Sequence, residues 1–327
     1  MGAFQDNFFA QLKAVQKKKR RPNGKKIPLS EVVAELLDVS RNTAYRKIRG
    51  EINVSVNEME ILTGHFKSDL NKAAYKTSSH DLFVKRAPSI TSMKSLEQYL
   101  EQLNIQLTSL SQRGANDIYF AARDLPFFHA FQQEELCSFK LAVWLRSFTM
   151  TNENQGTLPD IPRTLTESAK DVSNVYFSLP VTEVWNNETI SNTIHQVQYF
   201  RAAGFINKQR AQRILEDLQW ILRSFKRRAS RREASPDLVK GDLYSCDFSM
   251  LNNVALSSSG GKKVAYIGVS DLRFIETDDP STTSDVMHSF KRHIQMGKLM
   301  SGSAEKDREA FFNKQFLQVE KAVDSLK

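Results

Sequence analysis

The sequence predicts a mainly α-helical protein with a small β-sheet (α+β), in which an all-α N-terminal domain precedes a larger α+β domain. Apolar residues recur at helical spacing along most of the chain, and they alternate with period two only between about residues 244 and 276. The 327 residues exceed what one hydrophobic core commonly supports, so two domains are expected. We place them at residues 1–76 and 93–327, joined by a polar linker over residues 77–92.

The composition is that of a soluble globular protein, with 40% hydrophobic and 25% charged residues. No run of about 18 apolar residues occurs, which excludes a membrane span, and the N-terminal charges follow the apolar residues, the reverse of a signal peptide. Cys137 and Cys246 have neither a disulfide framework nor a metal-binding spacing. We therefore expect two buried thiols and a cytoplasmic location.

The net charge of +9 is concentrated in the N-terminal quarter of the chain. Residues 1–92 hold 17 Lys and Arg and 9 Asp and Glu, a net charge of +8, whereas the remaining 235 residues hold 29 and 28, a net charge of +1. A charge that only keeps a protein soluble would be spread out, whereas one that binds a polyanion is concentrated. The first domain is therefore expected to bind a polyanion.

The N-terminal domain is expected to begin with an amphipathic helix over residues 4–16. A basic stretch follows, with no acidic residue between Asp6 and Glu31, and residues 22–24 (PNG) predict a turn within it. Helical periodicity resumes at Leu29 and continues, with breaks, to about Leu70.

Residues 30–49, SEVVAELLDVSRNTAYRKIR, have the pattern of a helix-turn-helix motif. Such a motif needs apolar residues on the inner faces of two helices, small residues where they cross, a tight turn and an N-cap. Apolar and small residues occupy the required positions: Val33, Leu37, Val39, Ile48, Ala34 and Ala44. Asp38 is expected in a left-handed conformation at the turn, and Ser40 is expected to cap the second helix.

The second helix has a polar outer face of a kind that reads DNA. Its outer side chains are Arg41, Asn42, Tyr45, Arg46 and Arg49. Arg and Asn carry forked donors and acceptors that recognise guanine and adenine edges in the major groove. Ser40 and Thr43 can contact phosphate from the helix start, where free N–H groups and the helix dipole favour an anion. The alternative is a helix that is only solvated, or that binds a protein.

On the residues AELLDVSRNTAYRKIRGE, this segment resembles the Cro/repressor-like (XRE-type) helix-turn-helix family, and the resemblance covers about residues 4–70. In that family helices two and three form the motif and a fourth helix follows, a place that residues 56–66 fill here. The resemblance implies a base-reading role for Arg41, Asn42, Tyr45 and Arg46. It implies a contact with the DNA backbone for Arg49. The chain departs from the family at Asp38, where Gly is usual, and in the long join between its first two helices.

The basic stretch is a candidate arm that contacts DNA phosphates. Its cationic residues are Lys17, Lys18, Lys19, Arg20, Arg21, Lys25 and Lys26. Arms beside helix-turn-helix domains track the phosphate backbone or enter a minor groove, and we favour phosphate tracking. A non-specific tether to RNA or another polyanion is the alternative. A second basic run, residues 226–232, is expected to be a solvated loop without a role.

The C-terminal domain is expected to begin with a helix over residues 93–110. Its apolar residues recur at alternating spacings of three and four: Met93, Leu96, Leu100, Leu103, Leu107 and Leu110. This stripe predicts either a dimer seam or a helix packed on its own domain, since coiled coils usually need three to four heptads. A strand over residues 116–122 and a buried apolar helix over residues 136–148 follow.

Further along, an irregular loop is expected over residues 151–165 and a helical hairpin over residues 188–203 and 208–225. Period-two alternation predicts a strand over residues 244–250 that forms a β-hairpin with residues 264–269, and a third strand over residues 272–276. Helices over residues 284–296 and 305–326 complete the domain. The segments DIYFAARDLPFFHAFQQEELCSFKL and SGSAEKDREAFFNKQF resemble uncharacterised bacterial regulators of the same layout, a resemblance that names no ligand.

The sequence contains no pattern typical of catalysis or metal binding. The six histidines lack ligand spacing, His129 in PFFHAF is expected in the core, and no Gly-rich phosphate loop or catalytic Ser or zinc motif occurs. We therefore expect no enzyme activity, no cofactor and no metal.

The sequence therefore predicts a bacterial, cytoplasmic transcriptional regulator that binds double-stranded DNA sequence-specifically and forms a homodimer. Its C-terminal domain is expected to dimerise, to sense a small-molecule or protein effector, or to do both, and no membrane partner is expected. A helical adaptor that binds protein rather than DNA is the alternative. A DNA-modifying enzyme is a third option, and it would need clustered carboxylates for a metal, which the sequence lacks.

Overall fold

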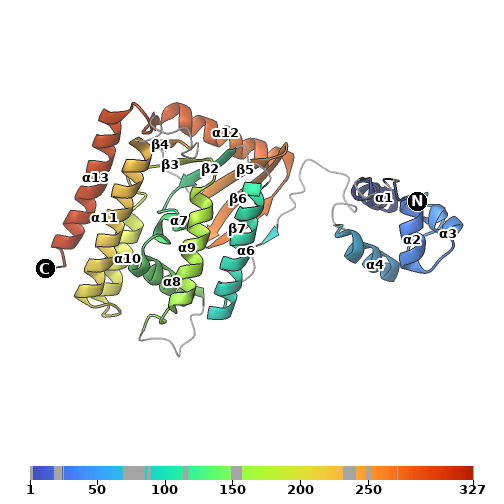
Figure 1. Ribbon diagram of the computed structural model, residues 1–327, viewed down its shortest axis with the longest axis horizontal. Helices are drawn as coiled ribbons and strands as arrows, with labels where there is room; N and C mark the ends of the chain where they lie inside the picture. The colour runs from blue at the N-terminus through green and yellow to red at the C-terminus, as the bar shows by residue number, and fades with distance from the viewer. Residues whose placement is uncertain are drawn as a thin grey trace. The chain divides into compact units, whose positions relative to one another are not determined.

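The computed structural model describes residues 3–17, 24, 26–68, 85–86, 90–112, 117–148, 157–230, 241–247, 252–270 and 272–326. The chain divides into two compact units, Met1–Phe83 and Val84–Lys327 (Figure 1). Within the described residues, no helix is both long enough and apolar enough to cross a membrane. The expected linker over residues 77–92 lies largely outside them. Its described part belongs to the larger unit, because residues 85–86 pair with a strand there and Ile90 is buried in its core.

The smaller unit is a group of short helices around one apolar core. The helices that the structure describes in it are α1 (Ala3–Gln16), α2 (Leu29–Leu37), α3 (Arg41–Ile48) and α4 (Val56–Phe66). Phe8, Phe9 and Leu12 of α1 are almost completely buried against residues of the other three helices. The helices predicted over residues 4–16 and 56–66 and the helix start at Leu29 are therefore confirmed.

The larger unit is built on one mixed β-sheet (Figure 1). Its helices are α6 (Met93–Gln112), α7 (Phe127–Ala130), α8 (Glu134–Phe148), α9 (Arg163–Phe177), α10 (Ser191–Ala202), α11 (Lys208–Ser230), α12 (Pro280–Met296) and α13 (Glu305–Asp324). Its strands are β1 (Lys85–Arg86), β2 (Asp117–Ala122), β3 (Val181–Trp185), β4 (Leu243–Ser245), β5 (Val254–Ser259), β6 (Lys262–Ser270), β7 (Arg273–Thr277) and β8 (Lys298–Leu299).

The strands that the structure describes lie in the order β1-β7-β6-β5-β2-β3-β4-β8. β2, β3 and β4 run parallel, and the other neighbouring pairs are antiparallel. Parallel neighbours need long crossovers, which α7, α8 and α9 supply between β2 and β3, and α10 and α11 between β3 and β4. The predicted α+β class is confirmed at this level.

Alternate residues of the strands face two different apolar layers. Phe120 of β2 belongs to the large core, which includes residues of α6 to α11 and of α13, whereas Ala121 belongs to a smaller cluster with Phe290 of α12. α12 therefore covers one face of the sheet, and the large core covers the other.

The β-hairpin forms, but its first strand is not the one predicted. β5 and β6 pair across Gly260 and Gly261, whose φ angles are 55° and 79°. A two-residue hairpin turn of this type needs a left-handed backbone at both positions. Residues 243–245 instead form β4, which pairs with β3 and β8, so the alternation near residue 244 belongs to a different part of the sheet. The predicted third strand corresponds to β7.

α9 and β3 are among the elements that were not predicted. α9 begins at Arg163, inside the expected loop over residues 151–165, and it buries Leu165, Ala169, Val172 and Tyr176 along one face. These residues recur at spacings of four, three and four, the period of an amphipathic helix, so the sequence does contain a signal for α9.

The second basic run is helical as far as Ser230, which corrects the expected solvated loop. Lys226 Nζ lies 2.7 Å from a carboxylate oxygen of Glu309, and the Arg228 guanidinium lies 4.2 Å from the centre of the Phe177 ring. These residues attach α11 to neighbouring elements of its own unit.

The leucine stripe of α6 packs into the core of its own unit. Its fully or largely buried members are Leu96, Leu100 and Leu107, and its partly buried members are Met93, Leu103 and Leu110. α6 lies against α9, which supplies the apolar surface that a second copy would otherwise provide. Of the two interpretations of the stripe, the dimer seam is therefore wrong and the packed helix is correct.

A buried carboxylate joins β3, α7 and α9. Glu183 of β3 is 3% exposed, and its oxygens accept hydrogen bonds from His129 Nε2 at 3.0 Å and Tyr176 Oη at 2.9 Å. Trp185 Nε1 donates a third bond at 2.6 Å. Burial alone would raise the pKa of Glu183, but the charge of His129 and these hydrogen bonds lower it below its ordinary value. His129 is a core histidine, as expected.

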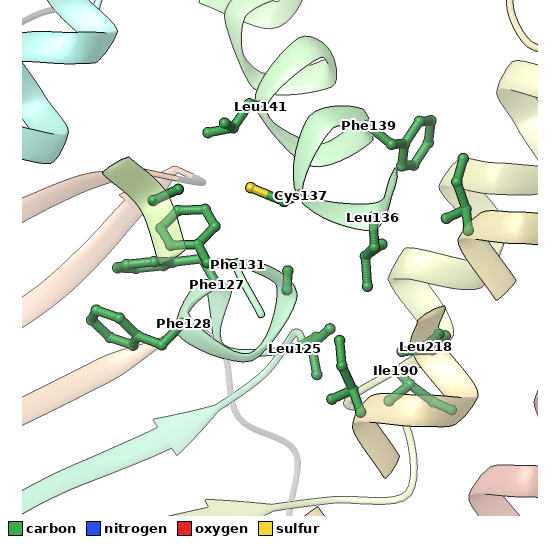
Figure 2. Close-up of a cluster of buried hydrophobic side chains, with 14 of the residues drawn as sticks. Leu125, Phe127, Phe128, Phe131, Leu136, Cys137, Phe139, Leu141, Ile190 and Leu218 are labelled. Atoms are coloured by element: carbon green, nitrogen blue, oxygen red, sulfur yellow. The ribbon is translucent and has the colours of Figure 1, made fainter. Parts of the chain in front are cut away.

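Both cysteines are buried and free, which confirms the expected thiols. Figure 2 shows Cys137 of α8 among apolar side chains that include Phe131 and Leu141. Burial, together with the nearby carboxylates of Glu134 and Asp217, raises the pKa of the Cys137 thiol. The thiol therefore stays protonated and acts as a small apolar group.

Leu100→Asp should unfold the larger unit rather than leave a folded monomer. Leu100 is fully buried, and an unpaired carboxylate in an apolar core costs a large part of the roughly 5 to 15 kcal/mol that stabilises a domain. Ile105→Asp is the matched control, because Ile105 of the same helix is 54% exposed, and this variant should stay folded. Thermal melting and gel filtration measure the outcome, and a folded Leu100→Asp protein would contradict the packing of α6.

Glu183→Gln should lower the free energy of unfolding by about 3 kcal/mol at neutral pH, because the buried donors of His129, Tyr176 and Trp185 lose the charged acceptor that they share. The pKa of Glu183 is lower in the folded chain than in the unfolded chain. The stability that ionised Glu183 contributes to the folded chain is therefore complete above pH 4.5, its ordinary pKa. This stability is lost as the pH falls through the lowered pKa of the folded chain. Urea unfolding at neutral and acidic pH should give stabilities for wild type and variant that converge in acid, and equal stabilities at neutral pH would disprove the role of Glu183.

Candidate functional site

The turn between α2 and α3 has the backbone conformation that the sequence predicts. Asp38 has φ 50° and ψ 48°, a left-handed conformation, and the Val39 N–H donates to Ala34 O at 3.0 Å. This bond closes the end of α2. α3 then begins at Arg41, three residues after Asp38.

Both ends of α3 are capped. Ser40 Oγ accepts the Thr43 N–H at 3.1 Å, which confirms the expected N-cap. At the other end the Gly50 N–H donates to Lys47 O and the Glu51 N–H donates to Arg46 O. This is the Schellman arrangement, and Gly50 supplies the positive φ, 75°, that it needs. The two caps fix where α3 starts and stops.

One face of α3 is buried in the core of the smaller unit. Ala44 is fully buried and Ile48 nearly so, and Val33 of α2 belongs to the same core. Lys47 lies on this inner face as well, because it is three positions from Ala44 and next to Ile48. It is only 7% exposed.

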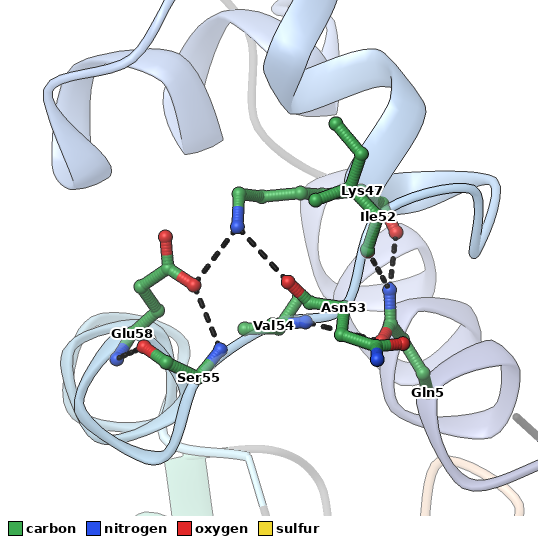
Figure 3. Close-up of polar contacts among 7 residues, drawn as sticks. All are labelled: Gln5, Lys47, Ile52, Asn53, Val54, Ser55 and Glu58. Atoms are coloured by element: carbon green, nitrogen blue, oxygen red, sulfur yellow. Dashed lines mark hydrogen bonds and ion pairs between the residues drawn. The ribbon is translucent and has the colours of Figure 1, made fainter.

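Gln5 of α1 holds the segment that follows α3, as Figure 3 shows. Its Nε2 donates to Lys47 O at 2.7 Å and to Ile52 O at 2.8 Å. Its Oε1 accepts the Val54 N–H at 3.2 Å. Because Gln5 is buried, its amide has no exposed alternative, and these bonds satisfy both the side chain and the backbone groups of the segment. α1 thereby fixes the exit of the chain from α3.

The Lys47 ammonium joins α3 to α4. Its Nζ donates to Asn53 O at 3.1 Å and to Glu58 Oε2 at 3.0 Å (Figure 3). Glu58 also accepts the Ser55 N–H at 2.8 Å, while Ser55 Oγ accepts the Glu58 N–H, which completes a capping box at the start of α4. Burial alone would raise the pKa of Glu58, but the Ser55 hydrogen bond and the Lys47 charge lower it.

The opposite face of α3 is exposed. It carries every residue for which a base contact was predicted, and the backbone-contacting residue follows the helix: Arg41, Asn42, Tyr45, Arg46 and Arg49. The Arg49 guanidinium lies 5.7 Å from the centre of the Tyr45 ring, and Tyr45 is 52% exposed. The hydroxyls of Ser40 and Thr43, expected at a phosphate, lie 2.9 Å apart and bond to each other at the first turn of α3.

Two carboxylates hold the arginines of this face. Arg41 Nη2 lies 3.0 Å from an oxygen of Glu31 on α2. Arg46 and Arg49 both pair with Glu51, each at 3.3 Å, and all of these side chains are partly or largely exposed. The structure thus brings Tyr45, Arg46 and Arg49 together, whereas Arg41 points toward α2.

The ends of the basic arm lie close together. Lys17 follows α1, Lys26 precedes α2, and both are exposed. Gln16 Nε2 donates to Ile27 O at 3.2 Å, so a direct bond joins the residues that flank the arm. The other cationic residues of the arm lie outside the described residues: Lys18, Lys19, Arg20, Arg21 and Lys25.

Sequence reasoning missed the residues that orient α3. Gln5, Lys47 and Glu51 act through contacts that join different elements, and pattern analysis does not pair such positions. Lys47 did leave a signal, because a lysine on the apolar face of a helix needs a buried partner. Glu58 is the partner, eleven positions further along.

The larger unit has a polar pocket of about 680 Å³ where the parallel strands end. Asp124, Asn187 and Asp247 follow β2, β3 and β4 and line it. Asp124 accepts hydrogen bonds from Lys140 and Asn192, and Asn187 donates to Asp247 at 2.7 Å, so these groups satisfy one another. Among the residues described by the structure, no group of three or more His, Cys, Asp and Glu could hold a metal ion.

No protein-family model, curated protein or solved structure matches this chain. What the molecule binds must therefore follow from its own residues and their geometry.

Gln5→Ala should loosen α3 and α4 while the larger unit stays unchanged. The change removes three hydrogen bonds to backbone groups, and each unsatisfied buried group costs roughly 1 to 3 kcal/mol. Hydrogen exchange of the α3 and α4 amides should become at least about tenfold faster, with no change in α8. Lys13→Ala, at an exposed position of the same helix, is the matched control. Unchanged exchange in Gln5→Ala would mean that these bonds do not hold α3.

Proposed function

We propose that this chain is a sequence-specific DNA-binding transcriptional regulator that reads double-stranded DNA with α3. One observation carries the proposal: α3 is fixed in the core by its inner face and presents Arg41, Asn42 and Arg46 on its outer face. Base reading needs this combination, because side chains discriminate bases only when a rigid helix holds them at the groove.

In this proposal α3 lies in the major groove. An arginine can bond guanine O6 and N7 with both arms of its guanidinium, and Asn42 can bond adenine in the same bidentate way. Tyr45 would contact a base next to those read by Asn42 and the arginines. Ser40, Thr43 and Arg49 would contact the DNA backbone and fix the register, as would the cationic residues of the arm. The net charge of +8 over residues 1–92 favours association with a polyanion.

The arginines that pair with Glu31 and Glu51 are expected to exchange these carboxylates for DNA. Exposed ion pairs contribute about 0 to 1 kcal/mol, so breaking them costs little. The same carboxylates repel phosphate, which disfavours a non-specific contact by these arginines and leaves base edges as their better partners. This arrangement supports sequence-specific rather than purely electrostatic binding.

The larger unit would act as the effector-sensing and dimerisation part of a cytoplasmic regulator. A homodimer would bind a pseudo-palindromic operator with half-sites about 34 to 36 Å apart. Because the α6 stripe is used within its own unit, the dimer would need another surface. An effector could change the spacing of the two DNA-binding units only if it binds two states unequally. Repression by occupancy and activation by contact with polymerase are both compatible with this scheme.

Selection of duplexes from a random library, after mobility-shift binding to a random duplex, tests the proposal. A recovered consensus with two related half-sites would support a dimeric regulator. Weak binding with no sequence preference would instead favour a helical adaptor that binds protein, and would overturn the proposal.

Arg46→Ala should lose roughly 1 to 3 kcal/mol of binding free energy on the selected site and relax base choice at one position. Arg163→Ala is the matched control, because Arg163 is also an exposed, ion-paired arginine but belongs to the larger unit. Competition assays with the selected site and its point variants measure both effects. An equal loss on selected and random DNA would mean that Arg46 does not read a base.

Lys19→Ala should weaken binding to all sequences alike and make the salt dependence shallower by about one unit of slope. For the wild-type chain, six to eight phosphate contacts would lower affinity by roughly 10³ to 10⁵ between 50 and 200 mM salt. Titrations at several salt concentrations on selected and random duplexes give these slopes. An unchanged slope in Lys19→Ala would remove this lysine from the phosphate contacts.

A further inference from the structure

A partly open cavity of about 380 Å³ lies between α6 and the sheet of the larger unit. Leu103 and Leu107 of α6 line one side, and Phe120 of β2, Ala255 of β5 and Phe274 of β7 line the other. Sites for small molecules are concave, mostly apolar and about 300 to 1,000 Å³ in volume. The cavity therefore has the size and the apolar lining of a ligand site.

The walls are aromatic as well as aliphatic. The rings of Phe128 and Tyr176 stack with 3.8 Å between their centres and 7° between their planes, and both residues line the cavity. Tyr176 is also held by Glu183 through its hydroxyl. These flat surfaces are fixed by buried contacts, so they can accept an apolar guest without first being ordered.

The cavity favours an uncharged guest. Glu276 is the only charged residue among the described residues that line it, and no lysine, arginine or histidine is present there. Burial raises the pKa of Tyr99, and burial together with the charge of Glu276 raises that of Tyr266, so both phenols stay protonated at neutral pH. An anionic guest would lose its hydration without meeting a cation, whereas a neutral guest could accept a phenol hydrogen bond.

We propose that this cavity is the effector site and that it takes an uncharged, largely apolar small molecule with a hydrogen-bonding group. The role as effector site rests on the proposed function, whereas the binding itself does not. The place of the cavity supports the role. α6 is the first helix described in the larger unit, and Glu276 of β7 is paired in register with Lys85 of β1, the first described strand after the unit boundary. A ligand between α6 and β7 therefore touches the elements through which the chain enters this unit.

Fluorescence titration of the full-length protein with N-phenyl-1-naphthylamine, an uncharged apolar probe, tests the binding. The matched probe is 8-anilinonaphthalene-1-sulfonate, which has the same ring skeleton and adds a negative charge. We expect saturable binding of one equivalent of the neutral probe and binding of the sulfonate that is weaker by about tenfold or more. Absence of saturable binding would overturn the proposal, and a sulfonate that binds equally well would overturn the preference for an uncharged ligand.

Two variants that fill the cavity locate the binding. Leu103→Trp and Ala255→Phe each place an aromatic ring into the space, from opposite sides. Each should weaken binding of the neutral probe by about tenfold or more. Ile105→Trp makes a similar change on the exposed side of α6 and should bind the probe like wild type. Circular dichroism selects the variants that keep the wild-type fold. Wild-type affinity in either folded cavity variant would place the probe elsewhere and refute the site.

The regulatory role has its own readout. The neutral probe should shift the affinity of the wild-type chain for its selected duplex by about threefold or more, and it should not do so in Leu103→Trp. A chain that binds the probe but no DNA at any salt concentration would overturn the proposed function and leave the ligand site standing. A chain that binds both without any coupling would refute the effector role alone.

Discussion

The amide of Gln5 holds together the parts of the smaller unit on which α3 depends. α3 has eight residues, so its apolar contacts alone are few, and its rotation about its own axis decides which side chains face outward. By bonding the backbone at Lys47, Ile52 and Val54, Gln5 ties α1 to the end of α3 and to the approach to α4. The exposed arginines owe their direction to polar contacts on the other side of the helix.

In the larger unit, too, a buried polar side chain joins several elements. Glu183 brings a carboxylate into a deeply apolar region, where an ion without partners would be very costly. His129, Tyr176 and Trp185 satisfy it, and they fix the relative positions of β3, α7 and α9 as a consequence. The wall that Tyr176 forms with Phe128 is thus positioned by a buried acid that is not among the residues lining the cavity.

Local features of the molecule could be predicted from the sequence, and contacts between distant elements could not. Asp38, Ser40 and residues 56–66 were placed correctly because turn conformation, capping and helical period depend on a few neighbouring residues. The exposed side of α3 followed from the same period. Gln5 and Lys47 were missed because their partners lie far along the chain. Likewise, the alternation around residue 244 predicted a strand, but it could not reveal that this strand pairs with β3 rather than with β6. The stripe of α6 did not distinguish a partner in the same chain, α9, from a second copy.

The two outer strands of the sheet have a consequence for the behaviour of the protein at high concentration. β1 and β8 each contain two residues, one of them a lysine, and the Lys298 side chain lies 3.1 Å from Asp307. An incoming polypeptide needs a long row of free amide and carbonyl groups to extend a sheet, and short lysine-bearing borders offer few. In the part of the chain that the structure describes, the sheet is therefore poorly suited to templating fibrils, and self-association that continues it from one molecule to the next is disfavoured.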